Sequence, residues 1–298
     1  MNQDLKGVKL SSKSKQTAIA LSIVTASFLT AFKLAVGLVA GSLAVIASAF
    51  DSLMDILVSS VNLIAVKEAD KPADREHLYG HGKIESLAGL FQSLLISVSG
   101  IYLVVEAVRR LIFGSRLEHI PVAIGVMVIS MGLTVLLVIR LKRVLRETQS
   151  IIVGTEALHF TTDLLTNGGV IIALVLVRLT GSNLWDLLVA FAIACYILKN
   201  SFEILRSAVN ELLDRALPLE EQREVEQIIL GFDPKIVGIH NLRTRKIGQR
   251  RFVDFHFEIR GESNFNRAHK LTEALIQKIQ ERFPNSDVTV HYDPEGAD

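Results

Sequence analysis

Long apolar stretches alternate with short polar ones over roughly the first two thirds of the chain. A stretch of about 20 apolar residues is long enough to cross a bilayer as a helix. Six stretches reach this length, and they cover residues 17–40, 42–66, 85–113, 120–141, 151–179 and 184–205. Gly41 and Ser42 leave only a tight turn between the first two. The pattern therefore predicts an α-helical membrane protein with six transmembrane helices in a domain over residues 1–213.

Lysine and arginine gather in alternate connections between these stretches. The N-terminal tail, the 67–83 connection and the 140–146 connection each hold four, whereas the intervening connections hold none, three and one. Because basic residues are retained on the cytoplasmic side, this asymmetry predicts that both termini are cytoplasmic. We expect no cleaved signal peptide, since no small-residue cleavage site follows the first apolar stretch.

From Asp214 onward the spacing of apolar residues changes to that of a small α+β domain. Leu219–Leu230 is an amphipathic acidic stretch that predicts a helix, and a strand is expected over 239–247. Residues 252–259 alternate strictly between apolar and polar, which is typical of a half-buried strand. Asn264 is placed to cap a helix that runs to about residue 283, and 287–292 predicts a last strand. The order α-β-β-α-β indicates a separate domain over residues 214–298.

Composition supports a membrane protein and argues against several other classes. Of 298 residues, 50% are hydrophobic, and the mean hydropathy of +0.39 is high for a soluble domain of this size. A net charge of +1 gives no reason to expect a nucleic-acid partner. The one cysteine, Cys195, excludes a disulfide framework or a thiolate metal site within one chain.

Four side chains that bind metals lie inside the apolar stretches. Asp51 and Asp55 are four residues apart in the second stretch, so they share one helix face. His159 and Asp163 repeat this spacing in the fifth stretch. Crowded carboxylates at membrane depth are costly unless they hold a cation or share a proton. Three carboxylates and one imidazole predict a tetrahedral site that suits Zn2+; we call these four residues the intramembrane quartet.

A second candidate cluster lies in the polar connection after the second stretch. Asp74, His77 and His81 could bind one cation there, because Gly80 and Gly82 permit a tight backbone. The alternative is that these histidines are simply solvated. We call the three candidate ligands the loop cluster.

A third candidate cluster lies in the C-terminal domain, where several potential ligands fall on or near the expected strands. His256 lies on the polar face of its strand, and His291 and Asp293 share one side of the last strand. Scattered surface histidines are the alternative, but among the 8 histidines of the chain only His119 falls outside a candidate cluster. The terminal cluster comprises His240, His256, His269, His291 and Asp293.

These motifs together resemble the cation diffusion facilitator family, in particular its bacterial zinc and iron efflux members. The resemblance covers the whole chain, including the D-x-x-x-D of Asp51 and Asp55 and the H-x-x-x-D of His159 and Asp163. It also includes segments 72–74, 80–83, 213–215 and 240–245. The resemblance implies a homodimer in the bacterial inner (plasma) membrane and a ferredoxin-like, copper-chaperone-like cytoplasmic domain. It also implies exchange of metal ions for protons.

The resemblance further implies a role for each cluster. The quartet would be the transport site, the loop cluster a second site, and the terminal cluster a binuclear site at the dimer interface. Lys83 and Asp214 match an ion pair between the membrane and cytoplasmic parts, and Tyr292 stands where some members carry Gln.

We therefore expect a proton-coupled exporter of divalent cations, with Zn2+ as both substrate and regulatory ion. The same ligands accept Cd2+, Fe2+, Co2+ and Mn2+. Two alternatives stay open on the sequence. A non-transporting metal sensor or assembly scaffold would bind metal only in the C-terminal domain. An intramembrane metalloenzyme would use the quartet to activate water, although no separate general base is evident and no catalytic residue or organic cofactor is predicted.

Overall fold

The computed structural model describes residues 2–40, 43–113, 120–182, 184–248, 250–261 and 264–296. It divides into two compact units, one formed by residues 8–209 and the other by residues 210–298 together with residues 1–7. The turn predicted at Gly41 and Ser42, and His119, lie outside the described residues.

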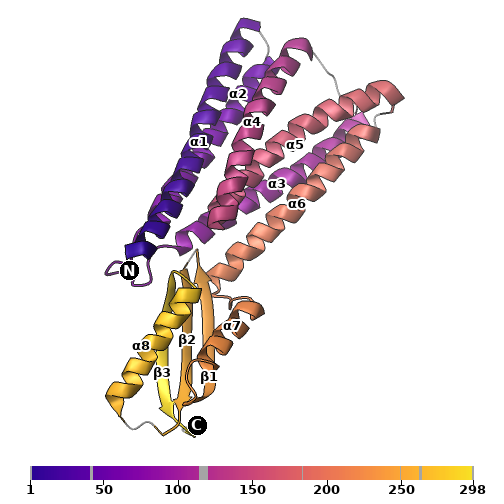
Figure 1. Cartoon of the computed structure of the whole chain (residues 1–298). Helices are drawn as coiled ribbons and strands as arrows, with labels where there is room; N and C mark the ends of the chain where they lie inside the picture. Colours follow the sequence, from indigo (N-terminus) through magenta and orange to yellow (C-terminus); the bar gives the residue numbers. More distant parts are fainter. Residues whose placement is uncertain are drawn as a thin grey trace. The chain divides into compact units, whose positions relative to one another are not determined.

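Long helices make up the first unit (Figure 1). In the described residues, five segments of these helices are long and apolar enough to cross a membrane, namely Ser12–Val39, Ser48–Ala69, Lys83–Glu106, Gly125–Thr148 and Leu187–Leu212. A multi-pass helical membrane protein is therefore confirmed, while the count of six spans stays a prediction. The helices are α1 (Asn2–Ala40), α2 (Leu43–Ala69), α3 (Lys83–Phe113), α4 (Ile120–Thr148), α5 (Ile151–Thr180) and α6 (Leu184–Leu212).

Helix α5 packs closely against its neighbours through small residues. A Cβ atom added to Gly89 of α3 would lie 2.2 Å from Cγ2 of Ile151, and one added to Gly169 would lie 2.3 Å from Cδ1 of Ile193 on α6. Small residues allow such close approach of helices in a bilayer, where no hydrophobic force drives the helices together. Helix α5 thereby packs closely against both α3 and α6.

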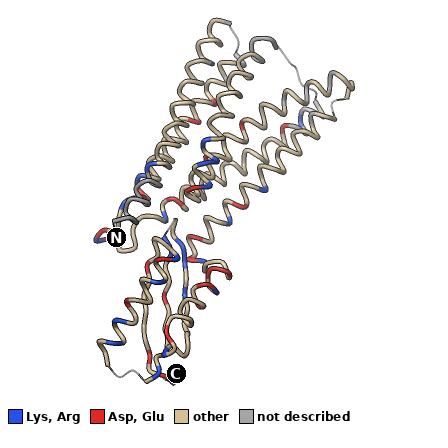
Figure 2. Tube along the Cα trace, in the orientation of Figure 1, with Lys and Arg blue, Asp and Glu red and all other residues tan. Residues whose placement is uncertain are grey.

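Charged residues of this unit gather toward the end of the bundle that carries the 70–82 connection (Figure 2). Some of them form a buried cluster there. Nζ of Lys15 lies 2.9 Å from Oδ1 of Asp70 and 3.0 Å from Oε2 of Glu85. This cluster joins the first helix to both ends of the connection between α2 and α3, so that connection is anchored at each end.

The described residues of the second unit form a three-stranded sheet and two helices. Strand β2 (Arg250–Ile259) is central, pairing antiparallel with β1 (Ile236–Ile247) and parallel with β3 (Ser286–Pro294). The parallel pair requires a crossover, which helix α8 (Phe265–Arg282) supplies. Helix α7 (Leu219–Leu230) precedes the sheet. The predicted order α-β-β-α-β is confirmed.

Apolar and polar residues alternate along β2, so the two faces of the sheet differ. Both helices pack on the apolar face. Val253, Phe255 and Phe257 are buried, and they pack with residues of both helices, including Ile229 of α7 and Leu275 of α8. The intervening polar residues of β2 therefore point to the other face, which neither helix covers. We call this second surface the polar face of the sheet.

Local signals in the sequence fix the ends of these elements. The side chain of Asn264 accepts hydrogen bonds from the backbone N–H groups of Asn266 and Arg267, as expected of a helix cap. Gly248 has φ +58° in the turn between β1 and β2, a conformation that glycine adopts without steric cost. Helix α1 begins at residue 2, well before the apolar stretch predicted from residue 17, because the preceding residues include good helix formers and no proline.

Candidate metal centres

Three members of the intramembrane quartet come together between α2 and α5. Nε2 of His159 lies 3.0 Å from Oδ1 of Asp55 and 3.9 Å from Oδ2 of Asp163. One ligand atom from each residue fits within a group in which all such atoms lie within 4.8 Å of one another. The three side chains are partly buried. Two carboxylates and one imidazole thus converge from two helices, in a spacing that one cation could bridge.

Asp51 lies one helical turn before Asp55 on α2 and is exposed. In the described part of the chain it is not a member of the three-residue group. It does interact electrostatically with Asp163, as expected of a carboxylate on the same helix face as Asp55. Its role as the fourth ligand stays a prediction.

Two further polar residues of the bundle, Lys33 and Asn62, also have partners. Nζ of Lys33 donates a hydrogen bond to Oγ of Ser52 at 2.8 Å, so its ammonium lies beside the helix that carries Asp51 and Asp55. Asn62 of α2 bonds to side chains on other helices. Its Nδ2 donates to Oε1 of Gln92 at 2.9 Å.

Sequence reasoning overlooked Glu156, which is completely buried on α5. It accepts hydrogen bonds from Ser59 and Asn62 of α2. The signal that could have found it is an acidic residue inside an apolar stretch, three positions before His159, since ionisable residues at membrane depth usually have a function.

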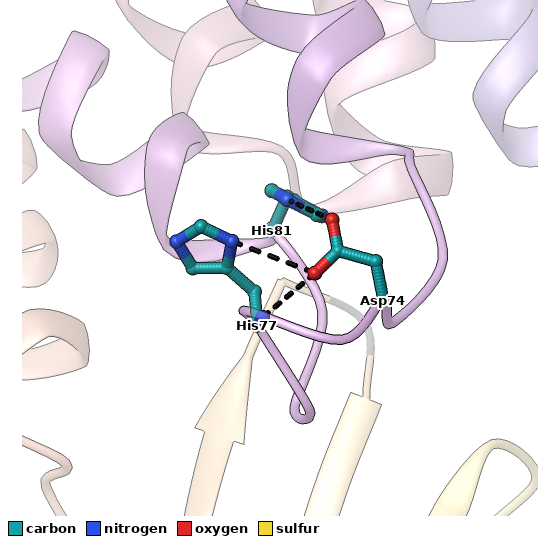
Figure 3. A group of neighbouring side chains, drawn as sticks. All are labelled: Asp74, His77 and His81. Atoms are coloured by element: carbon teal, nitrogen blue, oxygen red, sulfur yellow. Dashed lines mark hydrogen bonds and ion pairs between the residues drawn. The ribbon is translucent and has the colours of Figure 1, made fainter.

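The loop cluster forms around the carboxylate of Asp74 (Figure 3). Nε2 of His81 lies 3.3 Å from Oδ2, and Nδ1 of His77 lies 3.7 Å from Oδ1, so both rings reach the same carboxylate. Gly80 has φ +85°, which allows the chain to turn between the two histidines. The hydrogen bond from the backbone N–H of His77, at 2.7 Å, and a second from Glu76 hold the pKa of Asp74 below its usual value. The carboxylate is therefore ionised and available as a ligand near neutral pH.

The terminal cluster is built on one row across the three strands. His240 pairs in register with His256, and His256 pairs with His291. Neighbouring ring centroids lie 5.1 and 4.8 Å apart. The register of β1 shifts just after His240, where Asn241 has φ +52°; such bulges commonly re-aim side chains next to functional sites. Three imidazoles therefore lie side by side on the polar face of the sheet.

Asp293 lies at the centre of this row. Its carboxylate is 3.2 Å from Nε2 of His240, 3.1 Å from Nδ1 of His256 and 3.1 Å from Nε2 of His291. Partial burial alone would raise the pKa of Asp293, but the hydrogen bond with His256 and the charges of the three histidines hold it below its usual value. The arrangement offers an ionised carboxylate and imidazole nitrogens to a cation.

His269 and Tyr292 lie apart from this row. His269 is exposed on α8, where its ring stacks on Phe265 and its Nε2 lies 3.4 Å from Oε1 of Glu273. Tyr292 packs with the core on the helix-covered side of the sheet. Within one chain the described structure brings together three of the four predicted histidines, and the place of His269 at a dimer interface stays a prediction.

Lys83 and Asp214 belong to different units, and an ion pair between them stays a prediction. Within the C-terminal unit, Oδ2 of Asp214 lies 3.3 Å from Nη1 of Arg245.

Comparison with known proteins covers both units. A family model for the cation efflux transmembrane domain matches residues 19–213, and one for the cytoplasmic domain of cation efflux proteins matches residues 217–295. The chain is 41% identical over 254 residues to the cation-efflux pump FieF of Salmonella arizonae, covering 85% of this chain and 84% of the relative. It is 39% identical over 279 residues to FieF of Citrobacter koseri, covering 94% and 92%.

Solved structures of cytoplasmic domains are also similar to part of this chain. A metal-bound C-terminal domain of the CzcD transporter from Thermotoga maritima is 26% identical, covers 26% of this chain and 91% of that one, and has a TM-score of 0.25. The cytosolic domain of a cation diffusion facilitator family protein is 25% identical, covers 27% and 99%, and has a TM-score of 0.24.

Proposed function

The chain belongs to the cation efflux family, which is a family of transporters and not of enzymes, and we propose that it exports Zn2+ in exchange for protons. The observation that carries this proposal is the convergence of Asp55, His159 and Asp163 between two helices of the bundle. The carboxylates would balance the charge of a cation held there. Without a cation, such carboxylates are costly at membrane depth. The same three residues are therefore the proposed substrate site, with Asp51 as the fourth ligand.

Ligand chemistry supports zinc as the substrate. One imidazole nitrogen with carboxylate oxygens is a ligand set that Zn2+ takes up readily in tetrahedral geometry. Cd2+, Fe2+, Co2+ and Mn2+ accept the same donors, so they are proposed as weaker or secondary substrates. Affinity order alone does not rank them in a cell, where geometry and availability also decide.

Proton exchange follows from the protonation states that metal binding requires. A metal binds neutral imidazole and ionised carboxylate, so binding displaces any protons that these groups carry. In the proposed cycle, the cytoplasm-facing quartet loses protons as it takes up metal. The outward-facing quartet releases metal as protons return, with the site near the bilayer midplane throughout.

We further propose an orientation in the membrane, a homodimer and two additional metal sites. The distribution of lysine and arginine supports cytoplasmic termini in a bacterial inner membrane. The match to a cytoplasmic cation efflux domain supports a homodimer. The row of His240, His256 and His291 around Asp293 supports a regulatory metal site in that domain, and the loop cluster supports a further site.

The test is metal uptake into proteoliposomes that contain the unsubstituted protein. Zn2+, Cd2+, Fe2+, Co2+ and Mn2+ are presented in turn, with and without a pH gradient. We expect the fastest uptake with zinc, and acceleration when the release side is acidic. Metal binding without any flux would contradict the proposal and favour a sensor. Flux at the same rate with and without the pH gradient would contradict only the proposed proton exchange.

A further inference from the structure

A buried hydrogen-bond network joins the two helices that carry the proposed transport site. Glu156 of α5 is 0% exposed. Oγ of Ser59 donates a hydrogen bond to its Oε1 at 2.5 Å, and Nδ2 of Asn62 donates to its Oε2 at 2.5 Å. Both donors are on α2 and are themselves buried, at 0% and 3% exposed. One carboxylate thus fixes two points of the facing helix.

A third helix reaches the same network. Nδ2 of Asn62 also donates to Oε1 of Gln92 on α3, at 2.9 Å, and Gln92 is only 4% exposed. The amide of Asn62 is therefore held from two sides, which fixes its orientation toward Glu156. Polar side chains that bond between helices in this way hold helices together within a membrane.

The network lies one helical turn from the proposed cation ligands. Ser59 follows Asp55 by four residues on α2, and Glu156 precedes His159 by three on α5. At the pitch of an α-helix, about 5.4 Å per turn, these offsets place the two contacts on neighbouring turns. The contact between Asp55 and His159, at 3.0 Å, and the contacts of Glu156 together fix both the spacing and the rotation of α2 against α5.

Stability alone is a weak reason for burying this carboxylate. A buried charge is costly even when it is hydrogen-bonded, and replacement by apolar residues is often neutral or stabilising. In the described part of the chain, Glu156 accepts hydrogen bonds from two neutral side chains, Ser59 and Asn62. The same carboxylate interacts electrostatically with His159. Its placement is better explained by what it does to the neighbouring site.

We infer that Glu156 is a positioning residue for the transport site. Through Ser59 and Asn62 it holds α2 and α5 at the spacing at which Asp55 and His159 share one cation. This inference rests on the proposed function and adds to it a determinant of metal affinity and selectivity that binds no metal itself. Outer-shell partners of metal ligands typically change affinity by about 10–100-fold when they are removed.

The experiment compares Glu156→Gln with Glu156→Asp in the full-length protein in proteoliposomes. Glutamine keeps the length but replaces one acceptor oxygen with an NH2 group, so it cannot accept both hydrogen bonds. We expect the zinc concentration for half-maximal uptake to rise about tenfold or more, with a changed ratio of Zn2+ to Mn2+ uptake. Aspartate keeps both acceptor oxygens, so it should restore part of the lost affinity.

Ser201→Ala is the matched control, because it also removes a buried hydrogen bond between helices. Oγ of Ser201 donates to the backbone oxygen of Ser93 at 2.5 Å and accepts from Oγ of Ser97 at 3.0 Å, joining α3 and α6. This variant should unfold at a lower temperature in detergent while keeping the zinc dependence and the metal ratio. If Glu156→Gln behaves in the same way, Glu156 is only structural and the inference is overturned.

A milder variant keeps the test informative if Glu156→Gln does not fold. Ser59→Ala removes one of the two hydrogen bonds and should shift the zinc dependence in the same direction by a smaller factor. Unchanged zinc dependence and an unchanged metal ratio in Ser59→Ala would count against the inference. Absence of flux in the unsubstituted protein would be a different result, because it would overturn the proposed function itself.

Discussion

At the scale of single residues, substitution of Asp55 tests the proposed transport site most directly. Its Oδ1 lies 3.0 Å from Nε2 of His159, so Asp55→Asn removes a charge at the point where a cation would bind. We expect zinc flux to fall by more than the roughly 10–100-fold typical of outer-shell partners. The measurement is zinc uptake into proteoliposomes. Glu106→Gln, at the end of an apolar segment of α3, is the matched control and should transport normally.

His159 is the only nitrogen donor predicted in the quartet, which makes it the residue that should set metal preference. His159→Asp replaces a borderline ligand with a hard oxygen ligand, so uptake should shift from Zn2+ toward Mn2+. The measurement is the ratio of the two initial rates in one vesicle preparation. The same exchange at His77, in the exposed loop cluster, should leave this ratio unchanged. Equal ratios in all three proteins would count against His159 as a ligand.

At the scale of secondary structure, periodicity predicted the C-terminal elements closely because each carries a local signal. The alternation of β2 and the cap at Asn264 both depend on neighbours within a few residues. The extension of α1 to residue 2 was not predicted, because a polar stretch has no hydrophobic period that distinguishes a helix from a tail. The position of Asn241 in a bulge was not predicted either, since a bulge depends on the register of the partner strand.

The cap of α8 gives a prediction about local stability. Asn264→Ala removes the acceptor for two backbone N–H groups, which should cost about 1 kcal/mol. Hydrogen exchange of the 264–283 segment in the full-length protein should then accelerate by roughly fivefold. Asn266→Ala, at an exposed position within the same turn, keeps the cap and is the control. Equal exchange in both variants would show that this end of α8 is held by other contacts.

An ion pair lies directly after the ends of β2 and β3, and its contribution to stability depends on pH. Nε of Arg260 donates to Oε1 of Glu295 at 2.9 Å, and this hydrogen bond holds the pKa of Glu295 below its usual value of 4.5. Because the folded-state pKa of Glu295 is lowered, the ion pair stabilises the protein at pH values above 4.5. This stabilisation is lost as the pH falls through the folded-state pKa. Glu295→Gln should therefore reduce the unfolding temperature slightly at pH 6 and not at pH 3. A difference that is the same at both pH values would contradict this assignment.

At the scale of the whole molecule, the sequence predicts three candidate ligand clusters but not the contacts that support them. Spacing within one helix or loop is local, which is why His159 and Asp163, or Asp74 and His77, could be paired from the sequence. The contact of Glu156 with Ser59 joins residues 97 positions apart, and no periodicity in one helix encodes which residue faces it on another. His269 stays a prediction as a ligand at a dimer interface, since periodicity within one chain does not encode contacts with a second chain.

Coupling between metal and protons is the property that involves the whole transport cycle. Ligand chemistry requires ionised carboxylates and a neutral imidazole in the metal-bound quartet, so any protons on these groups must leave when zinc binds. Apparent zinc affinity should therefore rise with pH and level off once the site is deprotonated. The free imidazole titrates near pH 6.5 in water, so measurements from about pH 5 to 9 bracket its usual range.

The decisive measurement records zinc flux and proton movement in the same vesicles. To assign the protons to the quartet, the protein carries alanine at His77 and His81 of the loop cluster and at His240 and His256 of the terminal cluster. Zinc entry into vesicles should then be accompanied by proton exit, and Asp55→Asn in the same background should abolish both signals together. Zinc flux that continues without proton counterflow, at an unchanged rate across the pH range, would leave a uniport driven by the zinc gradient as the mechanism.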